Sequence, residues 1–258
     1  MKENNKIGFF TLCLLCCCFL FAGCSRLIRP PHKAGQLTSQ NGVPEKETGT
    51  LRVIVVIDTT QSVMSKWALI QKAVTTYLSQ LARGREYDVA IINLNSFPGD
   101  AQIIRNAQFN EEQWNGIKKE LSSTGKVGEG TNQLRAMQKV IEAATGEGNS
   151  KPEACVLLYF SDMLVDQPTD RSLRFDDWDK FDWTSLKRAN VRMSAFYVVT
   201  VADTSTVEAR KVVLRQEELI RSLKTAAEKA KLDIQWTPDK VLADDLAKGR
   251  FTGPVLDE

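Results

Sequence analysis

Val53-Ile54-Val55-Val56-Ile57 runs directly into Asp58-Thr59-Thr60-Gln61-Ser62. A continuous β-branched run of this kind is typical of a strand that is buried on both faces of a parallel sheet. The polar residues that follow it stand at the carboxyl end of the predicted strand. Ligands of open α/β sheets bind outside the carboxyl ends of the strands. This junction therefore predicts a parallel sheet with a ligand site at one edge.

Strand-like and helix-like segments alternate along the rest of the chain. Further strands are predicted at 89–94, 101–107, 155–160, 193–201 and 232–236. Helices are predicted over 64–81, 110–121, 134–141 and 207–231, followed by a final helix capped by Thr237 with Pro238 at its first position. Strands that alternate with helices predict a doubly wound α/β fold, with a mostly parallel sheet flanked by helices, as in Rossmann-like domains.

The composition limits the class of protein. The chain has 258 residues, of which 43% are hydrophobic and 26% charged, which fits one large domain plus appendages. A formal net charge of +2 argues against nucleic-acid binding, which needs a clustered basic excess. Most of the cysteines lie in the first 24 residues, so a disulfide framework is not indicated. Cys155, at the start of a predicted strand, is expected to be a buried apolar residue.

Residues 1–23 have the pattern of a secretory signal peptide. Lys2 and Lys6 precede an almost wholly apolar run over residues 7–22, and small residues follow it. The competing interpretation is a retained membrane anchor. The run is shorter than the roughly 18 to 20 residues that span a bilayer comfortably, which favours the signal peptide.

The end of the apolar run resembles a bacterial lipobox. Phe21-Ala22-Gly23-Cys24 matches that pattern at Ala22 and Gly23, with Phe21 where an aliphatic residue is usual. The resemblance implies a diacylated Cys24 as the first mature residue, and two or more acyl chains anchor a protein stably. Residues 24–50 then read as the lipidated cysteine and a flexible, Pro- and Gly-containing tether. The expected location is the cell membrane or outer membrane, lipid-anchored and facing the periplasm or exterior.

Three polar segments are predicted to meet at the carboxyl edge of the sheet. Asp58, Thr60 and Ser62 follow the first strand, Thr131 precedes a helix, and Asp162 follows the strand that begins at Cys155. Two carboxylates and three hydroxyls form an all-oxygen set, which hard cations such as Mg²⁺ or Mn²⁺ prefer. The hydroxyls are expected to coordinate directly, while the carboxylates act mostly through bound water.

These residues resemble the metal-ion-dependent adhesion site of von Willebrand factor A (vWA) domains. The motif Asp58-x-Thr60-x-Ser62, then Thr131 after Gly130, then Asp162 after a strand, has the order of that family. The resemblance covers roughly Leu51 to Phe251, within a domain predicted over 51–258. It implies a non-enzymatic domain that binds an acidic residue of a protein partner through the cation. The family usually has glycine after the last aspartate, and Met163 stands there instead, so the loop is expected to take a different path.

Three alternatives remain open at this point. Asp58, Thr60 and Ser62 are also residues that cap helices, without any metal. The second alternative is a metal-free scaffold of an envelope assembly. The third is a phosphohydrolase that uses Asp58 as its nucleophile. A Ser-His-Asp triad is excluded because the only histidine, His32, lies in the tether.

An acidic and aromatic segment follows Asp162. Phe175, Trp178 and Phe181 are candidate partner-binding residues, since exposed aromatics among charges serve as anchors at interfaces. The competing interpretation is that these rings pack on the sheet, because aromatic side chains usually lie inside.

Overall fold

A computed structural model describes residues 50–81, 86–95, 101–105, 109–124, 131–146, 151–164, 178–200, 205–232, 234–251 and 253. The chain divides into two units, 1–45 and 46–258, and all of the described residues belong to the second. The predicted signal peptide, Cys24 and the tether up to residue 49 lie outside them. Within the described ranges, no helix is long and apolar enough to cross a membrane.

The sheet has six strands in the order β3-β2-β1-β4-β5-β6. They are β1 (Leu51–Asp58), β2 (Tyr87–Leu94), β3 (Gln102–Arg105), β4 (Ala154–Ser161), β5 (Val191–Val198) and β6 (Ile234–Pro238). Only β3 is antiparallel to its neighbour, so the sheet is mostly parallel, as predicted. The sheet grows in one direction from β1 to β3 and in the other from β4 to β6. The direction therefore reverses between β1 and β4, which is where open α/β sheets bind ligands.

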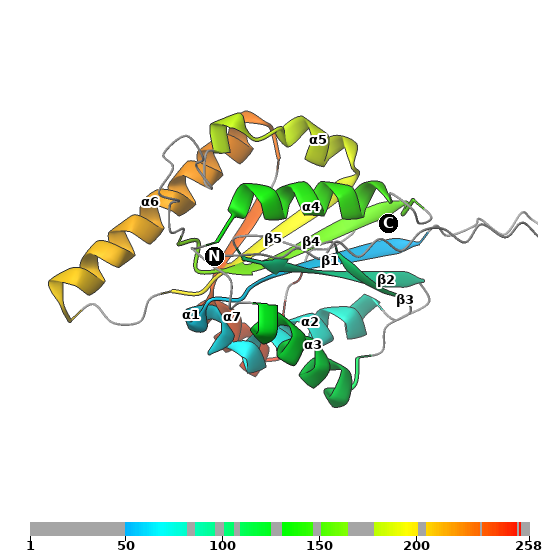
Figure 1. The fold of residues 1–258 in the computed structure, drawn as a ribbon, viewed down its shortest axis with the longest axis horizontal. Coiled ribbons are helices and arrows are strands. Elements are labelled where there is room, and N and C mark those ends of the chain that lie inside the picture. The colour runs from blue at the N-terminus through cyan, green and yellow to red at the C-terminus, as the bar shows by residue number, and fades with distance from the viewer. Residues whose placement is uncertain are drawn as a thin grey trace, which may run out of the picture. The chain divides into compact units, whose positions relative to one another are not determined.

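Helices cover both faces of the sheet (Figure 1). One face carries α1 (Gln61–Met64), α2 (Trp67–Leu81), α3 (Glu111–Thr124) and α7 (Asp239–Ala247). The other carries α4 (Gln133–Thr145), the short helix η1 (Trp178–Lys180), α5 (Trp183–Arg188) and α6 (Val207–Lys229). This arrangement confirms the predicted doubly wound α/β fold.

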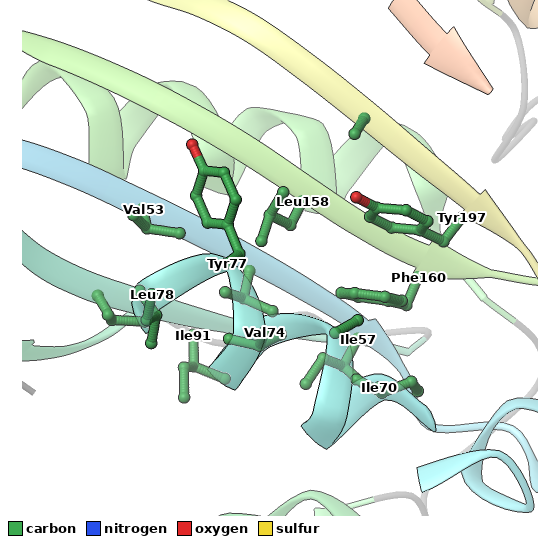
Figure 2. Close-up of a cluster of buried hydrophobic side chains, with 14 of the residues drawn as sticks. Val53, Ile57, Ile70, Val74, Tyr77, Leu78, Ile91, Leu158, Phe160 and Tyr197 are labelled. Carbon is green, nitrogen blue, oxygen red and sulfur yellow. The ribbon is translucent and has the colours of Figure 1, made fainter. Parts of the chain in front are cut away.

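The core explains why β1 reads as an unbroken apolar run. Every residue of β1 is buried. Val53 and Ile57 point to the α2 side, where Val74 and Tyr77 pack on them (Figure 2). Ile54 belongs instead to the cluster under α4. Burying one such aliphatic side chain contributes about 1.5–3 kcal/mol, so a strand apolar on both faces stabilises both layers.

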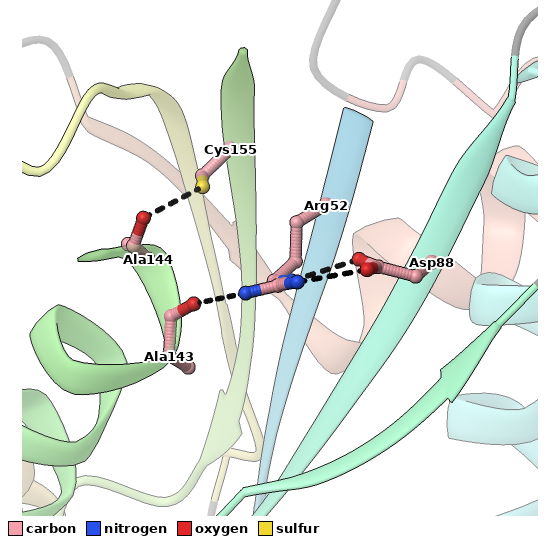
Figure 3. Close-up of polar contacts among 5 residues, drawn as sticks. All are labelled: Arg52, Asp88, Ala143, Ala144 and Cys155. Carbon is pink, nitrogen blue, oxygen red and sulfur yellow. Dashed lines mark hydrogen bonds and ion pairs between the residues drawn. The ribbon is translucent and has the colours of Figure 1, made fainter. Parts of the chain in front are cut away.

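A buried ion pair also joins β1 to β2 near their amino ends (Figure 3). Arg52 of β1 donates to both carboxylate oxygens of Asp88 of β2, at 2.8 Å each, and to the main-chain oxygen of Ala143 in α4 at 2.6 Å. The hydrogen bond with Asp88 raises the pKa of Arg52. Cys155 lies beside this pair as a free, fully buried thiol, and burial raises its pKa to about 12. The prediction that Cys155 is a buried residue is confirmed.

Two predicted helix starts need correction. The single helix expected over 64–81 is two helices, because Lys66 donates back to Val63 in a tight turn and Ser65 Oγ donates to the main-chain oxygen of Ser62 at 2.6 Å. Thr237 and Pro238 do not begin the last helix. They pair with β5 as the end of β6, and α7 starts after Pro238, whose extended backbone places it at the N-cap. A proline is tolerated there because β6 is an edge strand.

Candidate metal centre

The candidate site lies where β1 and β4 end side by side. Asp58 is the last residue of β1, Ser161 is the last residue of β4, and Asp162 follows it. The register pairs Ile57 with Phe160, which brings Asp58 level with Ser161. Two carboxylates that are distant in sequence therefore meet at the point where the sheet reverses its direction of growth.

The Asp58 carboxylate is held by two donors. Its side chain is fully buried, Oδ1 accepts from the backbone N–H of Thr60 at 2.9 Å, and Oδ2 accepts from Ser161 Oγ at 2.7 Å. Thr60 occupies the N-cap position of α1, but its side chain makes no capping hydrogen bond. The Thr60 Oγ1 atom lies 3.1 Å from Ser62 Oγ instead. The helix-capping interpretation therefore does not account for the Thr60 hydroxyl.

Asp162 is held from the other side of the site. Its Oδ2 accepts from Ser62 Oγ at 2.5 Å, and its Oδ1 accepts from the backbone N–H of Leu164 at 2.9 Å. Asp162 is buried, whereas Ser62 is exposed. The Ser62 side of the cluster thus faces solvent, and the carboxylates face the protein.

Thr131 joins the cluster through the loop after Asp162. Its Oγ1 donates to the main-chain oxygen of Leu164 at 2.7 Å, and the Thr131 side chain is buried. Leu164 thus accepts from Thr131 and donates to Asp162. Direct hydrogen bonds thus join Asp58 to Thr60, Thr60 to Ser62 and Ser62 to Asp162, while Thr131 connects to Asp162 through Leu164.

The donor set fits a hard divalent cation. Ser62 and Thr131 donate their hydroxyl protons to Asp162 and to the main-chain oxygen of Leu164. Ser62 Oγ therefore accepts from Thr60, and the oxygens of Ser62 and Thr131 each keep a lone pair for coordination. Burial, and then the charge of Asp162, raise the pKa of Asp58 to about 7. A cation beside both carboxylates would offset that repulsion. No cluster of three or more His, Cys, Asp or Glu side chains occurs in the described part of the chain, so a metal here would depend on the hydroxyls.

Several solved structures resemble this chain at low sequence identity. The von Willebrand factor type A protein from Catenulispora acidiphila matches with a TM-score of 0.37 and 13% identity, over 79% of this chain and 42% of that one. The pilus adhesin SpaC from Lactobacillus rhamnosus GG, in its open conformation, matches with a TM-score of 0.45 and 11% identity, over 80% of this chain and 30% of that one.

Proximal thread matrix protein 1 from the mussel byssus matches with a TM-score of 0.42 and 11% identity, over 78% of this chain and 47% of that one. The chain thus spans less than half the length of each of these structures. No protein-family model and no curated protein sequence matches it. The fold class itself follows from the strand order.

Met163 stands where the vWA motif has glycine, and its backbone is in the left-handed region with φ of +61°. Glycine adopts this conformation without penalty, whereas a residue with a Cβ pays about 1–2 kcal/mol. The Met163 side chain is buried in the cluster under α4 and α6. Met163 therefore keeps a left-handed backbone that would suit glycine. Burial of its side chain offsets the cost of that conformation.

Sequence reasoning missed four polar residues behind the site. Ser161, Gln133, Tyr159 and Gln216 are all buried, and each is linked by hydrogen bonds to Asp58 or to Asp162. Gln133 and Gln216 come from helices on the same face of the sheet. In the sequence, the one indication of these residues is that Gln133 and Gln216 are polar at helix positions that face the sheet.

The candidate partner-binding aromatics are not an exposed set. Trp178 is only 1% exposed, and its ring contacts Phe181 and Trp183. Phe181 is half-buried, and Phe175 lies outside the described residues. The expectation of an exposed anchor is wrong for Trp178, because its ring fills the cluster between α5 and α6, as the packing interpretation predicted.

Proposed function

We propose that this chain is a lipid-anchored protein of the cell envelope whose α/β domain binds a protein partner through Mg²⁺ or Mn²⁺. The observation that carries the proposal is the convergence of Asp58 and Asp162 at the carboxyl ends of β1 and β4, with Ser62 Oγ 2.5 Å from Asp162 Oδ2. It brings the two ends of a five-residue ligand set together at the point where the sheet reverses direction.

The chemistry of the set explains why a partner would be needed. Thr60, Ser62 and Thr131 supply neutral hydroxyl oxygens, and Asp58 and Asp162 offset the ionic charge mostly through water. A neutral inner shell leaves the ion electrophilic, and Mg²⁺ keeps several of its waters. Because Ser62 lies on the solvent side, an acidic side chain of a partner has access to the ion. The cation would supply the link between the two proteins, and no covalent chemistry is required.

The envelope location rests on the N-terminal pattern. Acylation of Cys24 would hold the domain at a membrane through the tether of residues 25–50. Mass spectrometry of the protein from its native envelope should show an acylated Cys24 with residues 1–23 removed. An unmodified Cys24, or an intact Met1, would contradict the anchor without touching the metal site.

A metal-free scaffold is the second candidate. The contacts that favour it are those of Ser62 with Asp162 and of Ser161 with Asp58, because they satisfy the carboxylates without a cation. A phosphohydrolase with Asp58 as nucleophile is less well supported. The Asp58 side chain has no exposed surface and both of its oxygens accept hydrogen bonds, so neither oxygen is presented to a substrate.

Manganese binding separates the first two candidates. Electron paramagnetic resonance measures free Mn²⁺ and so gives the Mn²⁺ affinity of each purified protein. The double variant Asp58→Asn, Asp162→Asn should bind Mn²⁺ about tenfold or more weakly than the wild type. Asp244→Asn, at an exposed position of α7, is the control and should bind as the wild type does. Capture of a partner from native envelopes should also require Mg²⁺ and fail in chelator. Partner capture that is equal in both conditions would establish the scaffold.

A further inference from the structure

A chain of buried polar side chains lies behind Asp58. Tyr159 of β4 contacts Gln133 Oε1 through its hydroxyl, and Gln133 Nε2 lies 3.2 Å from Ser161 Oγ. Ser161 Oγ lies 2.7 Å from Asp58 Oδ2. None of these four side chains is more than 1% exposed. This series of hydrogen-bonded side chains thus leads from the face of β4 that α4 covers to the edge of the candidate metal centre.

The hydrogen bonds of this series all donate toward Asp58 from Gln133 onward. Ser161 Oγ receives the N–H of Gln133 and the backbone N–H of Met163, the latter at 2.9 Å. A hydroxyl has one proton to give, and Asp58 is the acceptor that remains for it. At the other end, the Tyr159 hydroxyl donates to the amide oxygen of Gln133. This contact keeps the amide nitrogen turned toward Ser161.

Buried polar side chains are costly unless all of them are satisfied, so an apolar set would be the simpler filling for this space. Gln133 and Tyr159 lie in the same layer as Ile54, Val56 and Met137, which are all apolar. All of these polar side chains are buried, and the series ends at Asp58, at the edge of the candidate metal centre. What it determines is the orientation of one carboxylate, with Oδ2 tied to Ser161 and Oδ1 tied to the backbone of Thr60.

We infer that Tyr159, Gln133 and Ser161 are positioning residues that hold the Asp58 carboxylate ready for a divalent cation. This inference rests on the proposed function. Partners that hydrogen-bond metal-binding side chains orient them, and their loss typically costs 10–100-fold in metal affinity. None of the three residues belongs to the Asp-x-Thr-x-Ser set, and each acts on the ion through Asp58 alone.

The test is the Mn²⁺ affinity of the full chain, measured by electron paramagnetic resonance. Tyr159→Phe and Ser161→Ala should each weaken binding by about tenfold or more. Ser161→Thr keeps the hydroxyl and should restore most of the affinity. Tyr197→Phe is the matched control, since Tyr197 is also buried in the sheet and its hydroxyl has no hydrogen-bond partner in the described part of the chain. It should bind Mn²⁺ as the wild type does.

The outcomes separate this inference from the proposed function. A wild type that does not bind Mn²⁺ overturns both. A wild type that binds, with Tyr159→Phe and Ser161→Ala binding equally well, overturns the positioning role alone. An equal loss in Tyr197→Phe would show that any buried hydroxyl matters, and this also overturns it. Urea unfolding of each variant in chelator identifies a variant that fails to fold, and Tyr159→Phe then carries the test in place of Ser161→Ala.

Discussion

Gln216 Nε2 lies 2.6 Å from the main-chain oxygen of Asp162 and 2.8 Å from that of Val199. One buried amide of α6 therefore ties the segment after β4 to the segment after β5. The first turns of α6 before Gln216 are largely exposed, and Val207 and Leu214 are exposed aliphatic residues there. Gln216 is thus the point at which α6 joins the body of the domain, directly behind a candidate metal ligand.

Gln216→Ala should destabilise the protein and loosen Asp162. The substitution leaves two buried carbonyl oxygens without this donor, at a cost of about 1–3 kcal/mol in the free energy of unfolding. Urea denaturation in chelator measures it. Gln138→Ala removes a glutamine at an exposed position of α4 and should change stability by less than about 0.5 kcal/mol. Equal effects of the two substitutions would show that the Gln216 contacts contribute nothing.

Asp58→Asn should stabilise the metal-free protein at neutral pH. Burial and the charge of Asp162 raise the pKa of Asp58 from 3.8 to about 7. The pKa of Asp58 is higher in the folded protein than in the unfolded one. The stability that its protonated carboxyl contributes is therefore present below about pH 4 and is lost as the pH rises to about 7. Asparagine cannot ionise, so its free energy of unfolding does not carry this loss. The stability of the variant minus that of the wild type should therefore be roughly 2–4 kcal/mol larger at pH 8 than at pH 4.

Unfolding by urea at the two pH values, without metal, tests this difference. Mg²⁺ should then stabilise the wild type more than the variant, because the variant binds the ion more weakly. A variant that is less stable than the wild type at pH 8 would mean that the Asp58 hydrogen bonds outweigh the cost of its charge.

Met163→Gly sets two effects of opposite sign against each other. Glycine removes the left-handed strain at φ of +61°, a gain of about 1–2 kcal/mol. It also removes a buried methionine side chain, and truncation to alanine alone costs about 2–5 kcal/mol. The net result should be a loss of about 1–3 kcal/mol in thermal or urea unfolding. A more stable variant would show that strain, and not packing, dominates this position.

The sequence was informative wherever the structure is periodic. The β-branched run at Val53–Ile57 predicts a strand buried on both faces, and the positions of Asp58 and Asp162 after strands predict that they approach each other. The structure places both at the edge between β1 and β4. Their role as metal-site residues stays a prediction.

Contacts between distant buried polar residues were not predictable. Arg52 stands at the start of β1, and no local pattern distinguishes it from an exposed arginine. Its pairing with Asp88 follows from the parallel register of β1 and β2, which places the two residues opposite each other. Gln133 is similar, since only the packing of α4 on β4 brings it to Ser161. The burial of Trp178 also depends on packing between helices.

Asp88→Ala should be far more damaging than removal of the whole ion pair. It leaves the Arg52 guanidinium buried and uncompensated, which costs about 3–5 kcal/mol. The double variant Arg52→Met, Asp88→Leu replaces both charges by apolar groups and should recover most of that loss. Denaturation midpoints of the two variants give the comparison. A double variant that is no more stable than Asp88→Ala would indicate that the contact of Arg52 with the Ala143 carbonyl is itself essential.

Ser62→Ala and Ser65→Ala form the sharpest pair for the metal site. Both serines lie at α1, but Ser62 Oγ donates to Asp162 at 2.5 Å, while Ser65 Oγ donates to the main-chain oxygen of Ser62 at 2.6 Å. Ser62→Ala removes a neutral ligand and one donor to Asp162, so Mn²⁺ affinity should fall by about tenfold or more. Ser65→Ala removes a hydroxyl of similar exposure that faces the helix backbone, so the affinity should be unchanged. Because metal and partner affinities are linked, partner capture at limiting Mg²⁺ should fall only in Ser62→Ala. Equal Mn²⁺ binding by the two variants would remove Ser62 from the ligand set.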